Sequence, residues 1–168
     1  RNEFQKPELV RTNLAHTILL MKKIGIEDVA SFDFLDPPDS QNIRNALDSL
    51  TSLGALNAQG SLTEMGLLMA ELPLAPNISR MVIESEKYGC TQEVATIASF
   101  LGAKPVFVRP RESEKIADEM HSKFTVKYSD FLTMLNVWKQ YEKSGFDSRW
   151  VRDNFLNNKA LQEIEQVR

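Results

Sequence analysis

Few residues of this chain have the types and spacing that catalysis requires. Its two histidines, His16 and His121, are far apart in the sequence, and Cys90 is the single cysteine. Isolated histidines more often lie on a surface or face a partner than bind metal or act as a general base. Cys90 stands just before an expected helix start, and a small buried residue is the favoured interpretation. One cysteine excludes an intrachain disulfide and a thiolate zinc site, and favours a reducing compartment.

Three aspartates form the one acidic cluster that could be mistaken for a catalytic set. Asp33, Asp36 and Asp39 are spaced by three and surround the consecutive prolines Pro37 and Pro38. Aspartates beside prolines commonly form turns and cap helices. We therefore interpret these aspartates as turn and cap residues rather than as acid–base catalysts.

Sequence motifs for nucleotide hydrolysis and for common hydrolases are missing. The chain has no Gly-x4-Gly-Lys-[Ser/Thr] loop, no His-Glu-x-x-His and no Gly-x-Ser-x-Gly. No apolar run approaches the roughly 20 residues that a membrane-spanning helix needs. We expect no catalytic, cofactor or metal site in this chain and no membrane partner.

Arg109 is the most informative cation. It lies in the segment KPVFVRP, residues 104–110, whose two prolines restrict the backbone, and Arg111 and Lys115 follow. A held arginine beside a helix start could contact phosphate or an RNA base edge, but pattern alone favours a solvated charged loop. The formal net charge of −3 argues against a self-sufficient nucleic-acid binder. Any nucleic-acid contact must therefore be local or shared with other domains.

The first part of the chain has the element order of a winged-helix domain. Apolar spacings of three and four, with good cap residues, predict helices over 7–25, 39–54 and 63–72. A β-hairpin is expected between the last two helices, where Asn57 and Gly60 make the turn and would form the wing. The alternative is a plain helical domain with one added hairpin.

The segment SFDFLDPP, residues 31–38, joins the first two predicted helices. Phe32 and Phe34 alternate with Asp33, as in a short half-buried strand. The prolines that follow push Asp36 toward extended backbone. We expect an internal strand and turn here, with both phenylalanines in the core.

Beyond the prolines at 73 and 76 the chain is expected to be almost purely helical. Thr91 and Ser129 are expected helix N-caps, and Ile116, Met120 and Phe124 recur at every fourth position, as on one face of a helix. The last expected helix is still amphipathic at its end, so we expect the natural chain to continue.

Taken together, these segments resemble one protein family. PELVRTNLAHTILLMKKIGIED, FDFLDPP and ALDSLTSLGALNAQGSLTEMGLLMAELPLAPNISRMVIESEKYGCTQEV are similar to the region that follows the ATPase lobes of DEAH-box RNA helicases. VFVRP, KIADEMHSKF, SDFLTMLNVW and WVRDNFLNNKAL follow in the family's order. The resemblance covers nearly the whole chain, and it looks closest to the splicing and ribosome-biogenesis branch.

The resemblance implies a mainly α fold in two domains. A winged-helix domain with a small β-hairpin would span residues 7–75, and an α-helical ratchet-like bundle would span residues 76–168. Such a region is a non-catalytic, accessory part of an RNA helicase that helps form the RNA channel and couples ATPase lobe movement to RNA translocation or remodelling. The resemblance implies a role in pre-mRNA splicing or ribosome biogenesis.

The resemblance also implies partners that lie outside this chain. ATP and Mg would be bound by upstream ATPase lobes, and an oligonucleotide-binding-fold domain would follow. Single-stranded RNA would be bound in the context of the full helicase, and a G-patch activator protein would dock partly on the winged helix. The location would be nuclear or cytoplasmic, with the nucleus favoured.

Seven residues in segments that match the family are the RNA-contact candidates. They are Arg109, Ser129, Asp130, Thr133, Arg152, Asn154 and Asn157. Helix capping is the alternative for Ser129 and Asp130. Two departures stand nearby: Phe131 replaces a usual histidine, and Val151 replaces a usual cysteine. Phe131 either removes a polar contact near the channel or fills the core differently.

Three hypotheses follow from these patterns. The first is the RNA-channel region of a helicase. The second is a docking module for an activator protein, with no direct RNA contact. A free-standing winged-helix DNA binder is disfavoured, because Ile43 to Leu53 carries only one cation, Arg44, where a basic recognition helix is needed.

Overall fold

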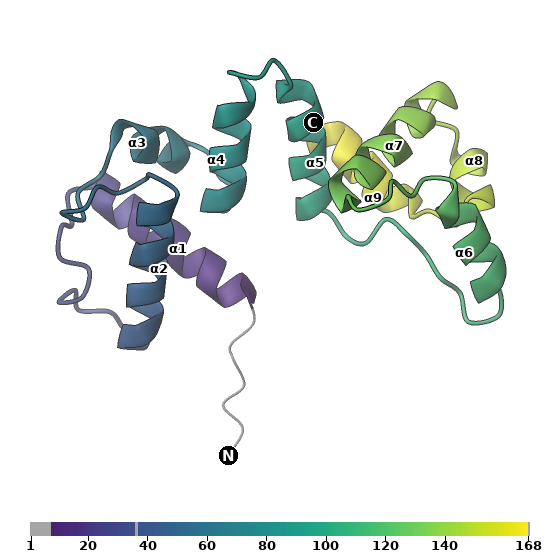
Figure 1. The fold of residues 1–168 in the computed structure, drawn as a ribbon. Helices are drawn as coiled ribbons and strands as arrows, with labels where there is room; N and C mark the ends of the chain where they lie inside the picture. Colours follow the sequence, from purple (N-terminus) through teal and green to yellow (C-terminus); the bar gives the residue numbers. More distant parts are fainter. Residues whose placement is uncertain (1–7, 36, 168) are drawn as a thin grey trace. The chain divides into compact units, whose positions relative to one another are not determined.

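The computed structural model describes residues 8–35 and 37–167, with side chains from Leu14 onward. The described chain is mainly helical, which confirms the expected fold class. Its helices, drawn in Figure 1, are α1 (Glu8–Lys23), α2 (Ser40–Ser52), α3 (Glu64–Glu71), α4 (Pro76–Ser85), α5 (Thr91–Gly102), α6 (Glu114–Ser122), α7 (Asp130–Lys143), α8 (Ser148–Asp153) and α9 (Asn158–Val167). The expectations for Pro7, Asp36 and Arg168 lie outside the described residues.

The first compact unit, which ends at Lys87, is built around α1 and α2. Ile18 and Leu19 of α1 and Leu50 of α2 are fully buried in one core. The α2 helix begins where the sequence predicts, because the carboxylate of Asp39 accepts a hydrogen bond from the Gln41 amide at 2.8 Å. That aspartate is therefore a helix cap, as interpreted from the prolines beside it.

The expected hairpin is present in its shortest form. Leu56 and Leu62 form a single antiparallel bridge, and the Asn57 amide donates to the Ser61 carbonyl. The Asn57 side chain also accepts hydrogen bonds from two amides of the turn, including that of Ser61 at 2.9 Å. Gly60 has a φ of +79°, a left-handed conformation that suits glycine.

The α3 helix packs closely on the start of this hairpin. Thr63 caps it, because its hydroxyl oxygen accepts a hydrogen bond from the Gly66 amide at 3.0 Å. A Cβ atom placed on Gly66 would lie 2.2 Å from the Ala55 carbonyl oxygen, so only glycine fits there. Gly66 therefore lets α3 pack directly against the backbone at the start of the hairpin.

The predicted strand in the segment between α1 and α2 is wrong. Described residues 31–35 form no β-ladder, and the Phe32 amide bonds back to the Val29 carbonyl in a turn. Phe34 packs against the core, whereas Phe32 is 42% exposed, and the two rings meet edge to face at 4.9 Å. The alternation of phenylalanines here reflects this local ring pair rather than a strand paired in a sheet.

The α4 helix belongs to the first unit. It packs against α3 and α1, and the Arg80 guanidinium donates to the Leu53 carbonyl at 3.2 Å. The compact units consequently divide between Lys87 and Tyr88. The sequence places a domain boundary earlier, at residues 75 and 76, because prolines flank that point.

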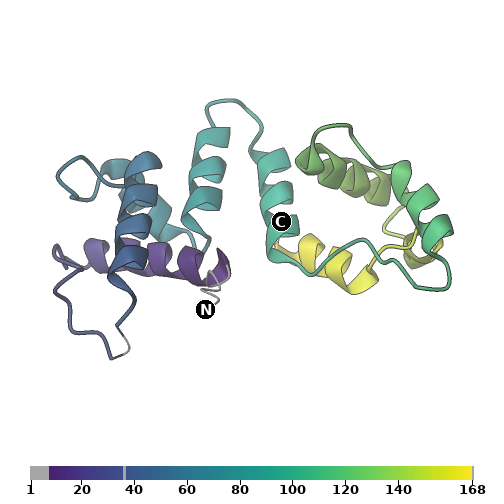
Figure 2. The same cartoon turned by 60° about the horizontal axis from the view of Figure 1, so that its bottom comes forward.

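The second unit has an aromatic core shared by α5, α7, α8 and α9. Figure 2 shows the ribbon of these helices, coloured from teal through green to yellow. Trp138 and Tyr141 of α7 are almost fully buried, with ring centroids 5.8 Å apart. Phe124 is 1% exposed and meets the Trp150 ring edge to face at 5.8 Å. The core of this unit is therefore rich in aromatic side chains.

Two details of the second unit differ from the expectations. The N-cap of α5 is Cys90, and Thr91 is the first helical residue. The α6 helix ends at Ser122, so Phe124 reaches the core from the segment that follows, and Ile116 is 53% exposed. The four-residue spacing in this region therefore does not mark a single buried helix face.

Candidate nucleic-acid interface

Arg109 forms an ion pair within its own unit. Its Nε and Nη2 donate hydrogen bonds to the two carboxylate oxygens of Asp118, both at 2.8 Å. Its Nη1 lies 3.4 Å from a carboxylate oxygen of Glu114. The hydrogen bonds from Arg109 lower the pKa of Asp118, and the same contact raises the pKa of Arg109. The guanidinium thus ties the connector between α5 and α6, residues 103–113, to α6.

The connector that carries Arg109 is paired with the segment before α9. Phe107 and Leu156 form an antiparallel bridge, and the Val108 amide donates to the Phe155 carbonyl at 2.9 Å. The Asn157 side chain caps α9, since its Oδ1 accepts from the Ala160 amide at 3.2 Å. The structure therefore brings Arg109 and Asn157 to two paired segments.

Asn157 also holds the connector itself. Its Nδ2 donates to the Pro105 carbonyl at 3.3 Å, and its backbone amide donates to the Val106 carbonyl at 2.7 Å. His121 of α6 lies at the same junction, with Nε2 3.0 Å from the Phe155 carbonyl and its ring 4.6 Å from that of Phe107. His121 is therefore packed against both the connector and the segment before α9.

Ser129 and Thr133 organise the start of α7. The Ser129 hydroxyl accepts a hydrogen bond from the Leu132 amide at 3.2 Å, as a helix N-cap. Thr133 is 9% exposed; its Oγ1 donates to the Ser129 carbonyl at 3.0 Å and accepts from the Val126 amide at 2.9 Å. Both hydroxyls are therefore engaged inside the protein, while Asp130 beside them is exposed.

Arg152 is the candidate whose charge is available. It is exposed on α8, and its guanidinium makes no ion pair or hydrogen bond with the described residues. Asn154, at the end of the same helix, donates from Nδ2 to the Trp150 carbonyl at 2.8 Å. Arg152 and Asp130 are thus the two candidates whose side chains are open to a ligand. RNA contact by any of the seven residues stays a prediction.

The two departures from the family pattern have different surroundings. Val151 is fully buried in the aromatic core, where an apolar side chain of its size fits. Phe131 is 45% exposed in the first turn of α7, so it does not fill the core. Of the two interpretations of Phe131, core filling is therefore excluded. Tyr128, three residues before Phe131, is not among the seven predicted site residues and is 92% exposed. A large aromatic residue directly before the helix-capping Ser129 is the sequence feature that indicates this exposed ring.

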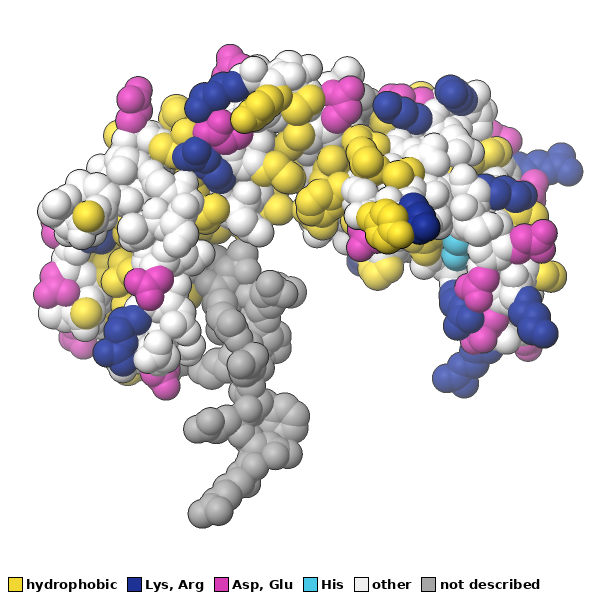
Figure 3. Space-filling model, viewed as in Figure 1, with side chains coloured by type: hydrophobic (Ala, Val, Ile, Leu, Met, Phe, Trp, Pro, Cys, Tyr) yellow, Lys and Arg dark blue, Asp and Glu magenta, His cyan; other side chains and the backbone are white. Residues whose placement is uncertain are grey.

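Charge is distributed unequally between the units. Residues 88–168 contain twelve lysines and arginines and eleven aspartates and glutamates, whereas residues 1–87 contain eight and twelve. Figure 3 shows basic and acidic side chains interspersed, without one continuous basic stripe on the visible face. The formal charge is therefore slightly positive in the second unit and negative in the first.

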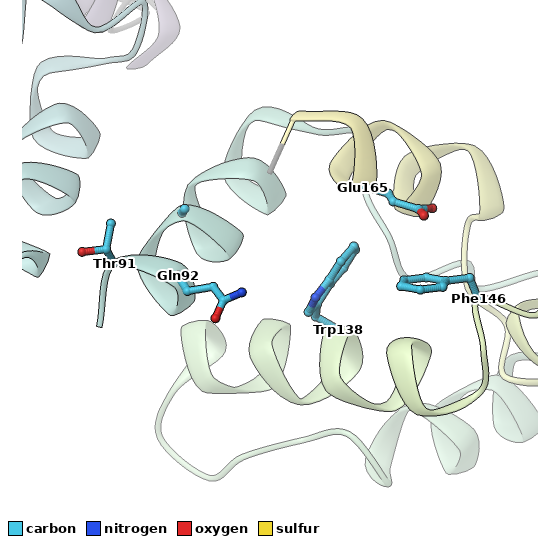
Figure 4. Close-up of a pocket in the computed structure, with 6 residues that line it drawn as sticks. Thr91, Gln92, Trp138, Phe146 and Glu165 are labelled. Atoms are coloured by element: carbon cyan, nitrogen blue, oxygen red, sulfur yellow. The ribbon is translucent and has the colours of Figure 1, made fainter. Parts of the chain in front are cut away.

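A depression in the second unit lies between α5, α7 and α9 (Figure 4). Its lining residues are Thr91, Gln92, Ala95, Trp138, Phe146 and Glu165. Burial, and then the nearby charge of Glu165, raise the pKa of Tyr141 below this surface. None of the seven candidate residues lines the depression, so it is separate from the predicted RNA contacts. Within the described chain no three His, Cys, Asp or Glu side chains gather as metal ligands, and none of the described helices could cross a membrane.

Two protein-family models match consecutive parts of this chain. The model of the helicase associated domain (HA2), winged-helix, matches residues 46–74, and that of the helicase associated domain (HA2), ratchet-like, matches residues 75–134. The two matches are consecutive and together cover more than half of the chain. The chain belongs to the helicase-associated domain family. Both parts are typical of the C-terminal region of DEAH-box helicases, which confirms the resemblance, whereas the splicing or ribosome branch stays a prediction.

The two matches also locate the candidates within the helicase-associated region. Arg109, Ser129, Asp130 and Thr133 lie inside the ratchet-like match. Arg152 and the two asparagines lie beyond residue 134, in α8 and the segment before α9 that pack on the same core. The family boundary falls at residues 74 and 75, whereas the packing boundary falls after α4.

Proposed function

We propose that this helicase-associated region forms part of the RNA channel of an ATP-dependent DEAH-box RNA helicase. Its role is to help couple ATPase lobe movement to RNA translocation or remodelling. The observation that carries the proposal is the consecutive match to the winged-helix and ratchet-like parts, in a chain without a phosphate-binding loop. ATP and Mg would be bound by upstream lobes, and we propose splicing or ribosome biogenesis, in the nucleus, as the setting.

The proposed contribution of this chain is positional. Exposed cations of the second unit hold the phosphate backbone of a single strand while the ATPase lobes move it. Arg152 is the leading residue for this role, because its guanidinium has no partner among the described residues. Since acidic and basic side chains alternate on the surface, we expect weak RNA binding by the chain alone, on the order of tens of micromolar at best.

The test is Arg152→Ala in the full-length helicase. Loss of one phosphate contact is expected to lower RNA-stimulated ATPase activity and to reduce the salt dependence of RNA affinity by slightly less than one unit of slope, about 0.7. Basal ATPase activity is the internal reference. Arg109→Ala is a poorer test, because it also breaks the ion pair with Asp118.

Arg44→Ala is the matched control. Arg44 is exposed on α2 and, within the described part of the chain, bonds to the Gln41 side chain alone, so this variant removes one positive charge from the winged-helix part. Equal RNA-stimulated activity in wild type and Arg152→Ala would contradict the channel proposal. A larger loss in Arg44→Ala than in Arg152→Ala would favour a nucleic-acid-reading winged helix instead.

A second function is favoured by exposed apolar side chains on the first unit. Leu67 and Leu68 of α3 are 46% and 49% exposed, and Ile24 after α1 is 75% exposed. The Lys23–Glu71 ion pair, at 2.6 Å, holds the ends of these two helices together. We propose that this surface docks a protein, such as a G-patch activator. Leu67→Ser with Leu68→Ser would then abolish activator binding while leaving RNA affinity unchanged.

A further inference from the structure

The turn between α6 and α7 places a tyrosine where backbone geometry favours glycine. The Ser129 amide donates to the Val126 carbonyl at 3.2 Å, which closes a four-residue turn. Tyr128, the third residue of this turn, has a φ of +68°. A positive φ at that position is the mark of a type II turn, where glycine or asparagine is preferred. A tyrosine there strains the backbone, and the rest of the structure must hold it.

Packing of the Tyr128 ring does not compensate for this strain. Tyr128 is 92% exposed, and among the described residues the group that meets its ring is the Lys127 amine, 4.9 Å from the ring centre. Phe146 is the useful comparison, because it also has a positive φ, +60°. The Phe146 ring packs against Tyr141 at 5.1 Å and Trp138 at 6.2 Å. The Phe146 ring thus packs against the core, whereas the Tyr128 ring faces solvent.

The turn that presents the Tyr128 ring is anchored on both sides. Thr133 accepts from the Val126 amide, and Asn136 donates to the carbonyl of the buried Phe124 at 2.9 Å. These two bonds fix the backbone before the exposed pair, and the bond from the Thr133 hydroxyl to the Ser129 carbonyl, 3.0 Å long, fixes the backbone after it. The ring is therefore presented from an ordered base, which lowers the entropy cost of binding something against it.

We propose that Tyr128, with Lys127 beside it, is a stacking site for an unpaired nucleobase of single-stranded RNA. An exposed ring next to an amine suits this ligand, because the ring stacks on a base while the cation contacts the adjoining phosphate. The inference rests on the proposed RNA-channel function and adds a base contact to it. Phe131, half exposed three residues later, adds a second aromatic surface at the same end of α7.

The local charge is compatible with a polyanion. Lys123 and Lys127 are exposed, and neither is in an ion pair with a described residue. Asp130 is the acidic side chain nearest in sequence, and it is also exposed. With two lysines and one aspartate, this stretch carries a net positive charge, which favours a phosphate as its ligand. A purely apolar protein partner would not account for the lysine over the ring.

The experiment compares two RNAs on the 168-residue chain by fluorescence anisotropy. One is a short single-stranded RNA, and the other is the same backbone with abasic sites. Tyr128→Ala is expected to weaken binding of the base-bearing RNA about fivefold or more and to leave binding of the abasic RNA unchanged. Tyr128→Phe, which keeps the ring, is expected to bind both RNAs as wild type does.

Two further variants separate stacking from folding and from charge. Tyr128→Gly removes the ring and the backbone strain together, so RNA affinity falls as in Tyr128→Ala while the thermal midpoint does not fall. Lys127→Gln is expected to lower the slope of affinity against salt, which Tyr128→Ala leaves unchanged. Tyr88→Ala is the control, because Tyr88 is 80% exposed beside a lysine that is already paired with Glu84.

The outcomes distinguish this inference from the proposed function. If Tyr128→Ala binds base-bearing RNA as tightly as wild type while Arg152→Ala binds more weakly, the stacking site is overturned and the channel role stands. Equal losses of affinity for both RNAs would also overturn stacking, because Tyr128 would then act on the sugar–phosphate backbone that the two RNAs share. No binding of either RNA by the wild-type chain overturns the stacking site, while the channel role is decided by Arg152→Ala in the full-length helicase.

Discussion

Arg109 donates two parallel hydrogen bonds to Asp118, from Nε and from Nη2, each 2.8 Å long. This two-pronged geometry uses the donors that a guanidinium would otherwise offer to a phosphate. The residue that looked most suited to RNA from the sequence is thus already bound to its own domain. Any RNA contact by Arg109 has to use the second N–H of Nη2 or those of Nη1, which lies 3.4 Å from Glu114, or replace the Asp118 carboxylate.

The first prediction concerns this ion pair. Arg109→Lys keeps the charge but cannot reproduce the fork, so it is expected to be less stable than wild type by nearly as much as Arg109→Ala. Asp118→Asn should cost a similar amount, and the double variant no more than either single one. Urea denaturation followed by tryptophan fluorescence measures this, because both tryptophans lie in the second unit. Additive losses would contradict the pairing.

The pH dependence of the same pair has a definite sign. The hydrogen bonds from Arg109 lower the pKa of Asp118 in the folded protein. Its stabilising contribution is therefore complete above the unfolded-state pKa of an aspartate, about 3.9. It is lost as the pH falls from there through the lower folded-state pKa. The difference in stability between wild type and Asp118→Asn should shrink over that acidic range and stay constant from pH 5 to 8.

The second prediction tests the tight contact of α3 with the hairpin. In Gly66→Ala the new methyl group would meet the Ala55 carbonyl at 2.2 Å, and overpacking of this kind costs about 1–3 kcal/mol. The unfolding midpoint by far-ultraviolet circular dichroism is expected to fall, while the tryptophan fluorescence midpoint is unchanged. Gly102→Ala, where an added Cβ meets nothing within 4 Å, is the control that should unfold no earlier than wild type. Equal midpoints for all three proteins would contradict the contact.

The sequence predicts those features that depend on neighbouring residues. Asp39 and Ser129 were expected helix caps, and both accept the amide hydrogen bonds that define a cap. A cap bond spans two or three residues, so its residue types and spacing are visible in the chain. The hairpin at Asn57 is predictable for the same reason.

The features that depend on distant partners could not be predicted. A period of two in Phe32 and Phe34 indicates a strand only if another strand lies alongside, and the described fold supplies none there. Arg109 meets Asp118 because the connector turns back along α6, a path that charge spacing does not reveal. The strain at Tyr128 likewise depends on the dihedral angles of a turn, which the residue types there do not favour.

The third prediction concerns Thr133, whose hydroxyl bridges the turn and α7. Thr133→Val keeps the volume but leaves the Val126 amide without its acceptor, which costs about 1–3 kcal/mol for a buried donor. Thr133→Ser keeps the oxygen and should lose much less. Denaturation followed by tryptophan fluorescence compares the two. If the serine variant is as unstable as the valine variant, the hydroxyl is not the stabilising group.

The fourth prediction separates structure from RNA contact at Asn157. Asn157→Ala removes the cap of α9 and the bond to the Pro105 carbonyl, so it should cost about 0.5–2 kcal/mol or slightly more. Asn157→Asp keeps an oxygen that accepts from the Ala160 amide, because aspartate is an equally good N-cap. Its stability should therefore stay close to that of wild type, apart from the lost Pro105 bond.

The aspartate variant then isolates the RNA contact of this residue. A carboxylate in place of the amide would repel a phosphate and cannot donate a hydrogen bond. If Asn157 contacts RNA, Asn157→Asp should weaken RNA affinity in the full-length helicase while the unfolding midpoint of the chain stays near wild type. Asn45→Asp, at an exposed asparagine of α2 that is not an RNA-contact candidate, is the matched charge control. Equal RNA affinities for wild type and Asn157→Asp would show that this asparagine serves only to cap α9 and hold the connector.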